Sequence, residues 1–335
     1  MTGYGAGMSP DSYLLAGTDV SIPPLGVGTW AWGDRSTWGM GGYDSELTVA
    51  SIEGAWDASI DAGVTLFDTA EIYGRGESER IIGEMRRRDP VRAASVVLAT
   101  KFMPSPWKLN VRGALLKSLR ASLRRLDVAC VELYQLHGPV SLRSHAALAD
   151  ALAAAREAGL VKAVGVSNYS VKETRSIAAA LDKRGMRLAS NQIEFSLLRR
   201  APETGGLLAA CAELGVVPLA YSPIGQGRLT GKYSEANPPP GKRTFSNHPM
   251  GLVDAVVTQL RAVGDKHGGK TPSQVALNWV MAKGAVPIPG AKNKAQAEEN
   301  AGALGWRIDD EDLAVLDEAA LAGIRNISSR VWQHG

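Results

Sequence analysis

The sequence has few cysteines, no long apolar run and almost no net charge. Two of its 335 residues are cysteines, Cys130 and Cys211, and neither lies in a CxxC pair. This excludes a disulfide framework and predicts buried thiols in a reducing compartment. No apolar run approaches the ~18 residues that cross a bilayer. The 37 basic and 34 acidic residues give a net charge of +3, without the basic excess that is typical of nucleic-acid-binding domains.

Residue patterns for metal binding and serine hydrolysis are also missing. The histidines, at positions 137, 145, 248, 267 and 334, lack the spacing of metal ligands, so no metal site is expected. No nucleophile-elbow motif surrounds a serine. The first fifteen residues contain neither a basic segment followed by an apolar one nor an arginine-rich segment, so no secretory signal or transit peptide is expected. We therefore expect a cytoplasmic protein, with a processed plastid protein as the alternative.

Short apolar segments alternate with amphipathic segments along most of the chain. The predicted strands are 25–29, 66–68, 96–101, 131–137, 161–167, 189–194, 216–221 and 285–289. The predicted helices are 45–62, 78–88, 111–126, 144–158, 171–183, 204–214, 252–266, 272–283, 294–302 and 309–321. The segment 237–249 is too rich in proline and glycine for regular structure.

Eight such β–α units predict a parallel sheet closed into a (β/α)8 TIM barrel, with extra helices and a C-terminal tail, in a single domain over residues 1–335. Hydrophobic residues make up 45% of the chain, which is enough for a large core. The alternative is an open doubly wound sheet. That fold requires a glycine-rich turn after the first strand, where this sequence has WAWGD.

Polar side chains end most of the predicted strands. Asp68, Lys101 and His137 end strands two to four, and Tyr73 follows Asp68 by five residues. Because active sites of α/β barrels form at the C-terminal strand ends, these side chains should surround one opening. Taken singly, a strand-end aspartate is more often a helix cap, and a lone lysine, histidine or tyrosine more often carries a surface charge or packs in the core.

The four residues together suit one reaction. A tyrosine pKa near ~10 is too high for an efficient acid at neutral pH, and a nearby ammonium lowers it. Lys101, held by Asp68, would supply that charge, and His137 would hydrogen-bond a carbonyl beside Tyr73. This predicts a general acid with an electrophilic partner, which protonates an oxygen as hydride reaches the carbon. An isomerase barrel would not require this set.

Eight segments resemble, in order, the motifs of the aldo-keto reductase superfamily. They are GVGTW, GVTLFDTAEIYG, LATKF, YQLHGP, AVGVSNYS, NQIEFSLL, LAYSPIGQGRLTGKY and IPGAKNKAQAEEN. The resemblance covers roughly residues 22–320 and is greatest for the plant and bacterial branch that includes chloroplast pyridoxal reductase. It implies an eight-stranded α/β barrel and NADPH-dependent reduction of an aldehyde or ketone. Pyridoxal and other aromatic or aliphatic aldehydes are candidate substrates.

The resemblance also implies roles for individual residues. Asp68, Tyr73, Lys101 and His137 would form the catalytic tetrad, with Tyr73 as the proton donor in reduction. The residues implied for NADPH binding are Thr29, Trp30, Ser167, Asn168, Gln192, Tyr221, Ser222, Pro223, Gly225, Gly227, Leu229, Gly290, Lys292, Gln296, Glu299 and Asn300. The residues implied as walls of the substrate pocket are Trp30, Trp32, Trp107 and Trp332.

Two departures from the family pattern bear on specificity. Gly138 follows the tetrad histidine where many relatives have a bulky residue, so a wider pocket is expected. Gln296 stands where some branches have arginine, which makes the preference for NADPH over NADH milder. Lys292 and Lys294 still favour NADPH, because they precede a short helix whose N-terminus attracts anions. GQGRLTG follows the seventh strand and predicts a flexible loop that covers phosphates.

A binding function is the alternative to an enzyme. The potassium-channel β subunits share the fold, the cofactor site and the tetrad, so the chain could resemble an NADP(H)-binding regulatory module. The lack of a long N-terminal extension and the closer match to reductases favour the enzyme. The expected partner is a small carbonyl compound, without nucleic acid or membrane, and both a monomer and a homo-oligomer remain open.

Overall fold

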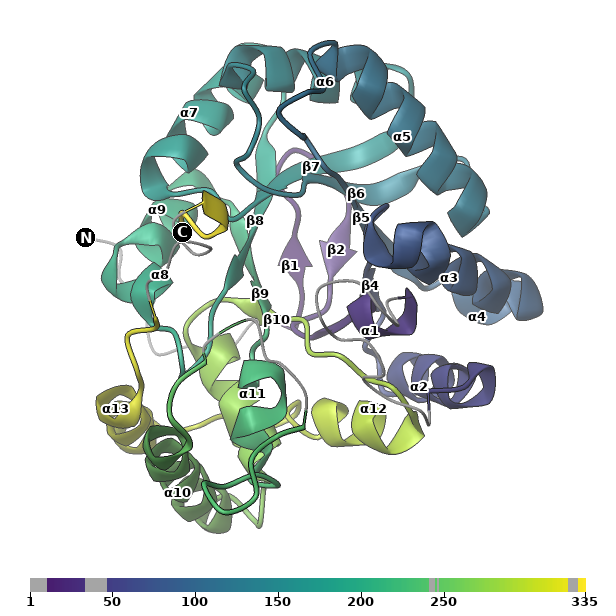
Figure 1. Cartoon of the computed structure of the whole chain (residues 1–335). Coiled ribbons are helices and arrows are strands. Elements are labelled where there is room, and N and C mark those ends of the chain that lie inside the picture. Colours follow the sequence, from purple (N-terminus) through teal and green to yellow (C-terminus); the bar gives the residue numbers. More distant parts are fainter. Residues whose placement is uncertain (1–10, 34–46, 241–244, 246, 325–330) are drawn as a thin grey trace.

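Eight parallel strands form the centre of the molecule. The computed structural model describes residues 11–33, 47–240, 245, 247–324 and 331–335. The strands follow the order β3-β4-β5-β6-β7-β8-β9-β10, and a parallel bridge between Gly28 and Gly290 joins the first strand to the chain just after the last. The sheet is therefore closed, and helices surround it (Figure 1). The predicted TIM barrel is confirmed.

The elements have the following bounds. The barrel strands are β3 (Gly26–Gly28), β4 (Leu66–Asp68), β5 (Val97–Phe102), β6 (Val131–Leu136), β7 (Val161–Ser167), β8 (Leu188–Glu194), β9 (Val217–Tyr221) and β10 (Val286–Pro287). The helices that follow are α2 (Val49–Asp61), α3 (Glu77–Arg88), α4 (Pro90–Ala93), α5 (Val111–Leu126), α6 (His145–Glu157), α7 (Val171–Asp182), α8 (Ala201–Thr204), α9 (Leu207–Leu214), α10 (Met250–Lys266), α11 (Pro272–Ala282), α12 (Lys294–Ala301) and α13 (Asp310–Ala319).

Local sequence explains why α5 begins and ends where it does. The Asn110 side chain accepts a hydrogen bond from Gly113 N and caps the first turn, which satisfies a backbone donor that has no partner within the helix. The apolar side chains of α5, Val111, Leu115, Leu119, Leu123 and Leu126, are all buried. Asp127 adopts a left-handed conformation at φ 58° and ends the helix.

A small hairpin escapes sequence prediction. Strands β1 (Tyr13–Leu14) and β2 (Ser21–Ile22) pair antiparallel and are visible through the barrel in Figure 1. Leu15 and Ile22 are fully buried and pack with barrel residues such as Leu66 and Leu133. The hairpin therefore covers the end of the barrel where the strands begin, and it leaves the other end for a site.

Other differences from prediction are local. The predicted helix 45–62 is α2, which Thr48 caps; positions 45 and 46 lie outside the described residues. The predicted helix 204–214 is divided, because Gly206, at φ 80°, separates α8 from α9. Both cysteines are free, but Cys130 is only half-buried, so the prediction of two buried thiols is wrong for one of them. No helix in the described ranges is long and apolar enough to span a membrane.

Candidate active site

A pocket opens at the end of the barrel where the strands finish. Its volume is about 820 Å³. Its walls include three of the four predicted tetrad residues, Asp68, Tyr73 and His137. The predicted cofactor residues that line it are Trp30, Ser167, Asn168, Tyr221, Ser222, Pro223, Gly227, Gly290, Lys292, Gln296, Glu299 and Asn300. The structure thus gathers residues from both halves of the chain at one mouth.

Lys101 lies beneath the pocket floor and connects the tetrad. Its side chain is fully buried on β5. The Nζ atom donates to Asp68 Oδ2 at 2.5 Å, to the Thr69 carbonyl at 2.8 Å and to the Tyr73 hydroxyl at 3.2 Å. An ammonium has three N–H donors, so every donor of Lys101 is aimed at a protein oxygen.

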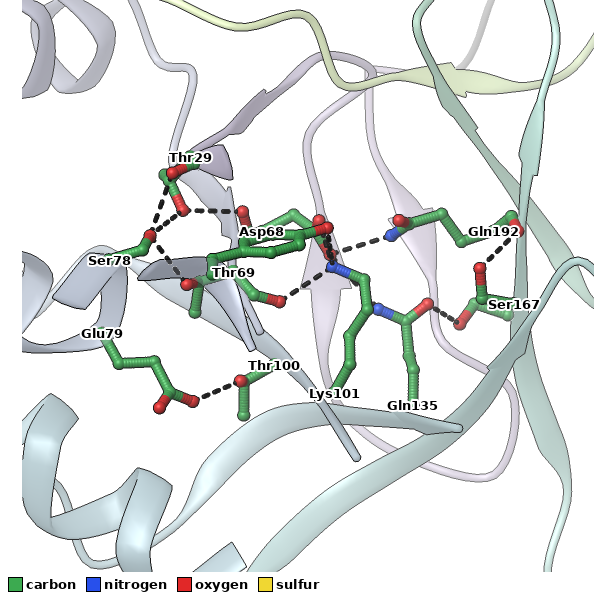
Figure 2. A network of polar contacts seen from close by, with 12 residues as sticks. Thr29, Asp68, Thr69, Ser78, Glu79, Thr100, Lys101, Gln135, Ser167 and Gln192 are labelled. Carbon is green, nitrogen blue, oxygen red and sulfur yellow. Dashed lines mark hydrogen bonds and ion pairs between the residues drawn. The ribbon is translucent and has the colours of Figure 1, made fainter. Parts of the chain in front are cut away.

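Asp68 is held from both sides. Its Oδ1 atom accepts hydrogen bonds from Gln192 Nε2 at 2.8 Å and from Gln135 Nε2 at 3.2 Å, while Oδ2 faces Lys101 (Figure 2). A buried carboxylate is costly unless it is paired and hydrogen-bonded. Asp68 meets both conditions, so its position is fixed at the end of β4. Gln135, on β6, was not predicted as part of the site.

A hydroxyl network ties the strand ends to α3. The Thr29 hydroxyl donates to the Asp68 carbonyl at 2.9 Å and lies 2.7 Å from the Ser78 hydroxyl. Thr69 donates to the same Ser78 hydroxyl at 2.9 Å. All these side chains are buried. The network fixes β3, β4 and the first turn of α3, which flank the turn that carries Tyr73.

That turn needs glycine to bring Tyr73 over the mouth. Gly74 has φ 58°, and a Cβ at this position would lie 1.9 Å from the Gly33 carbonyl oxygen. Only glycine permits this approach of two backbone segments. The Tyr73 ring then lies 5.5 Å from the His137 ring, edge to face. His137 Nδ1 is buried and has no hydrogen-bond partner among the described atoms.

Burial decides the protonation of the tetrad. Burial, and secondly the Asp68 carboxylate, raises the pKa of Tyr73 well above its ordinary value of 10.0. Burial lowers the pKa of His137 well below 6.5, and the Lys101 charge lowers it further. Burial also lowers the pKa of Lys101, against the opposing effect of Asp68. The expected lowering of the tyrosine pKa by Lys101 is therefore wrong for this structure, because burial disfavours the charged phenolate. Tyr73 remains a phenol, and His137 remains a neutral imidazole.

The ends of β7 and β9 form the next part of the wall. The Tyr221 hydroxyl donates to Asn168 Oδ1 at 3.0 Å, and Asn168 Nδ2 donates to Ser167 Oγ at 3.1 Å. Asn168 and Ser222 have positive φ angles, 63° and 51°. Such backbone is uncommon outside glycine and concentrates at functional sites. The predicted loop GQGRLTG is a tight 3-10 turn, η3 (Gly225–Thr230).

Two cationic side chains, Lys232 and Lys292, also line the pocket. Lys292 precedes α12, whose N-terminus Asn293 caps, and the Lys292 backbone N–H donates to Gln296 Oε1 at 3.0 Å. Lys232 also lines this pocket and was not predicted. The sequence around it, TGKY, gives only a weak indication of a pocket residue. The fold is what brings that segment to the pocket.

Several predicted residues do not line the pocket. Trp32 is buried in the core at 1% exposure and donates from Nε1 to the Ala291 carbonyl at 2.7 Å. Trp107 is 78% exposed on the surface. The predictions of pocket walls at these two positions are wrong, since one side chain fills the core and the other faces solvent. Thr29, Gln192, Gly225 and Leu229 are buried behind the lining, where they support it.

Gly138 does not leave the pocket wider. A Cβ at Gly138 would lie 2.8 Å from the Trp332 ring, and that ring is 5.7 Å from the His137 ring. Trp332 and Trp30 both line the pocket. An indole from the end of the chain therefore occupies the space that the missing side chain leaves.

A histidine and two carboxylates also meet away from the mouth. Atoms of His267, Asp309 and Asp312 lie within 4.8 Å of one another. Lys266 Nζ is 2.6 Å from Asp312 Oδ1, and His267 Nε2 is 3.0 Å from Asp312 Oδ2. The buried carboxylate is thus already balanced by a lysine, which explains the cluster without a metal.

Comparisons with known proteins agree with this geometry. The model of the Aldo/keto reductase family matches residues 24–321. The chain is 38% identical to a chloroplastic pyridoxal reductase of Arabidopsis thaliana, over 94% of this chain and 87% of that protein. A thermostable aldo-keto reductase solved with the inhibitor epalrestat superposes with a TM-score of 0.74 at 28% identity, over 92% of this chain and 99% of that one.

A glycerol dehydrogenase from Gluconobacter oxydans superposes with a TM-score of 0.78 at 26% identity, over 96% of this chain and 99% of the other. Family model, sequence relative and solved folds all extend across the barrel and its tetrad. The chain belongs to the aldo/keto reductase family and is an oxidoreductase.

Proposed function

We propose that the protein reduces an aldehyde or ketone to the alcohol with NADPH, and that Tyr73 donates the proton. The observation that carries this proposal is the placement of Lys101 Nζ between Asp68, at 2.5 Å, and the Tyr73 hydroxyl, at 3.2 Å. NADPH supplies the hydride when it is bound, because no side chain can donate one.

The tetrad side chains divide the remaining work. Lys101 donates a hydrogen bond to the Tyr73 oxygen, so the O–H of Tyr73 is left to point toward the pocket. As the proton leaves, the ammonium stabilises the phenolate that forms. His137 is neutral because its pKa is lowered, and it binds the carbonyl oxygen beside Tyr73. The raised pKa of Tyr73 keeps the donor protonated before reaction.

The pocket walls fit the parts of a dinucleotide. Ser167 and Asn168 would bind the nicotinamide amide, and Tyr221 would support the ring. Gln192 would act from behind the wall, because its backbone carbonyl accepts a hydrogen bond from Ser167 Oγ at 2.9 Å. Lys232 and Lys292 also line the pocket and would bind phosphates. The N-terminus of α12, which begins next to Lys292, adds positive potential. The left-handed backbone of Asn168 and Ser222 supports a binding role at this position.

The aromatic walls favour a flat substrate. Trp30 and Trp332 line the same pocket as Tyr73 and His137. A contact between two aromatic rings, stacked or edge to face, adds about 0.5–1.5 kcal/mol beyond the area that the rings bury. The pyridoxal reductase among the relatives supports an aromatic aldehyde of that kind as a candidate. The preferred substrate is therefore a planar aldehyde.

Tyr73→Phe tests the proposal directly. The variant should lose turnover by roughly 10²–10⁴-fold, the usual contribution of a general acid. NADPH should still bind with unchanged affinity, because the cofactor contacts are elsewhere. Fluorescence titration with NADPH and NADH would measure binding, and NADPH oxidation over a set of aldehydes that includes pyridoxal would measure turnover.

The outcomes separate the candidate functions. Unchanged turnover in Tyr73→Phe would remove Tyr73 as the acid. Failure of the native protein to bind NADPH would remove the reductase altogether. Tight binding of NADPH without oxidation by any aldehyde would favour the alternative, a regulatory module that carries the cofactor.

A further inference from the structure

The last described segment, Val331–Gly335, lies beside β8 (Figure 1), and its residues Val331 and Trp332 line the pocket. It contacts the ends of three strands. The His334 N–H donates to the Asn168 carbonyl at 3.1 Å, and His334 Nδ1 lies 2.9 Å from Glu173 Oε1. This segment was predicted only as a tail that brings one tryptophan to the pocket.

A buried ion pair holds the segment in place. Glu194, at the end of β8, is 2% exposed, and Arg199 is 5% exposed. Arg199 Nε lies 3.7 Å from Glu194 Oε2. Gln333 Nε2 donates to Glu194 Oε2, and an Arg199 guanidinium N–H donates to the Gly335 carbonyl. Buried charges require such partners, so the segment completes the surroundings of this pair.

The held segment has two effects on the site. It places the Trp332 ring 5.7 Å from the His137 ring and within 2.8 Å of the place where a Gly138 side chain would begin. It also brings Gln333 Nε2 to 3.1 Å from the Tyr221 hydroxyl. One segment therefore borders both the carbonyl position and the residue expected to support the nicotinamide.

We propose that Glu194 and Arg199 are positioning residues, which fix Val331–Gly335 so that Trp332 selects flat aromatic carbonyl compounds over small aliphatic ones. The proposal rests on the proposed reductase function. Gly138 belongs to the same arrangement, because any larger residue there would displace the indole. Neither charged residue lines the pocket, so their effect on substrate passes through the segment.

Hydrogen exchange tests the fixation without any need for activity. In Gln333→Ala, the His334 amide should exchange at least about tenfold faster than in the native protein, since a local contact that protects it is lost. Glu194→Gln keeps an acceptor for Gln333 and should retain most of the protection, whereas Glu194→Ala should not. Equal exchange of the His334 amide in Gln333→Ala and in the native protein would overturn the proposal that these contacts fix Val331–Gly335.

A substrate series tests selection. Trp332→Ala should raise the KM for benzaldehyde by about three- to tenfold, the range expected for one lost aromatic contact, with little change for propanal. Gly138→Val should act in the same direction, because it pushes the indole aside. Gln333→Ala should show a smaller effect of the same pattern. Trp107→Ala removes an exposed tryptophan outside the pocket and is the matched control.

Each result bears on one part of the proposal. Equal changes in KM for both aldehydes, or none, would overturn selection by Trp332. Tighter NADPH binding in both Trp332→Ala and Gln333→Ala would mean that the segment occupies the cofactor's place. This result would also overturn selection of the substrate by Trp332. If none of the aldehydes tested supports NADPH oxidation by the native protein, the proposed function fails, and the proposed selection by Trp332 fails with it. The exchange result would still decide whether these contacts fix Val331–Gly335.

Discussion

Lys101 shows how a single residue links stability and chemistry in this protein. Its ammonium is buried, and its partners are a carboxylate, a carbonyl and a phenol. Burial lowers its pKa, and the Asp68 carboxylate opposes that effect. Tyr73 therefore has a positive charge beside its hydroxyl only if the fold buries Lys101 together with Asp68.

We expect Lys101→Met to destabilise the protein by about 3–5 kcal/mol, because it leaves the Asp68 carboxylate buried without its cation. The double variant Lys101→Met with Asp68→Asn should recover part of the loss, since no unpaired charge then remains. Urea unfolding would give both values. A double variant that is less stable than Lys101→Met would contradict this account of the pair.

The pH profile follows from the shifted pKa values. Tyr73 works as a donor only while protonated, and its pKa is raised above 10.0. The pKa of the Lys101 ammonium is lowered from 10.5, so loss of the lysine proton should set the alkaline fall in activity, below pH 10.5. His137 works while neutral, and its pKa is lowered below 6.5, so activity should fall only below that pH. We expect a level kcat/KM between the two limits, measured with a planar aldehyde. An acidic fall with its midpoint above pH 6.5 would contradict the role of neutral His137, and an alkaline fall with its midpoint above pH 10.5 would contradict the role of the Lys101 ammonium.

Three members of the tetrad, Asp68, Lys101 and His137, were predictable from sequence because they lie at the ends of successive strands, and Tyr73 because it follows Asp68 by five residues. Gln135 was not predictable, although it donates a hydrogen bond to Asp68. The sequence VELYQL does not show whether its amide side chain points into the barrel or away from it. The two misplaced tryptophans have the same cause. Whether Trp32 faces the core or the pocket depends on the helix α1 (Trp30–Gly33), which is too short to leave a periodic pattern.

At the scale of elements, α3 supports the turn that carries Tyr73. This turn, η2 (Tyr73–Gly76), runs directly into α3, and α3 packs on α5 through Gly83. A Cβ at Gly83 would lie 2.2 Å from the Arg125 carbonyl oxygen. The glycine is thus required by the contact of two helices and not by its own backbone angles.

Gly83→Ala should destabilise the protein by about 2 kcal/mol, although alanine favours a helix over glycine by about 1 kcal/mol, because the added methyl group forces the helices apart. Glu84 is exposed on the same helix, so Glu84→Ala should change the free energy of unfolding by less than about 0.5 kcal/mol. Thermal unfolding of both variants would compare them. A stabilised Gly83→Ala would show that helix propensity outweighs the contact.

Elements with a cap and a long apolar stripe were predicted well. The prediction for α5 matches residue by residue, and β7 also has its predicted bounds. The hairpin of β1 and β2 was missed because two-residue strands carry no alternation to detect. The extra turn α8 was missed because glycines at its end resemble an ordinary loop.

At the scale of the whole molecule, barrel closure assembles the site. Gln192 reaches Asp68 across 124 residues of sequence, and Gly28 pairs with Gly290. Lys232 and Lys292 arrive at one pocket from segments on either side of α10 and α11. A ligand that spans the mouth would therefore contact most of the barrel strands at once.

Ligand binding should stabilise the whole fold. At a concentration a hundredfold above its Kd, NADPH should add about 2.7 kcal/mol and raise Tm by several degrees. NADH at the same concentration should raise Tm less, since it lacks the phosphate that Lys292 is expected to bind. Lys292→Ala should reduce the NADPH shift and leave the NADH shift unchanged. Equal shifts for both cofactors in the native protein would contradict the assignment of Lys292.

The sequence by itself determined the barrel, the bounds of its long elements and the four tetrad residues, because hydrophobic periodicity and polar strand ends are local signals. Only the tertiary structure decided the direction of the Tyr73 pKa shift, since burial and the nearby Asp68 carboxylate raise that pKa. It also decided which tryptophans reach the pocket and that Trp332 lies against Gly138. These features depend on contacts between distant segments, and the chain acquires them only when the barrel closes.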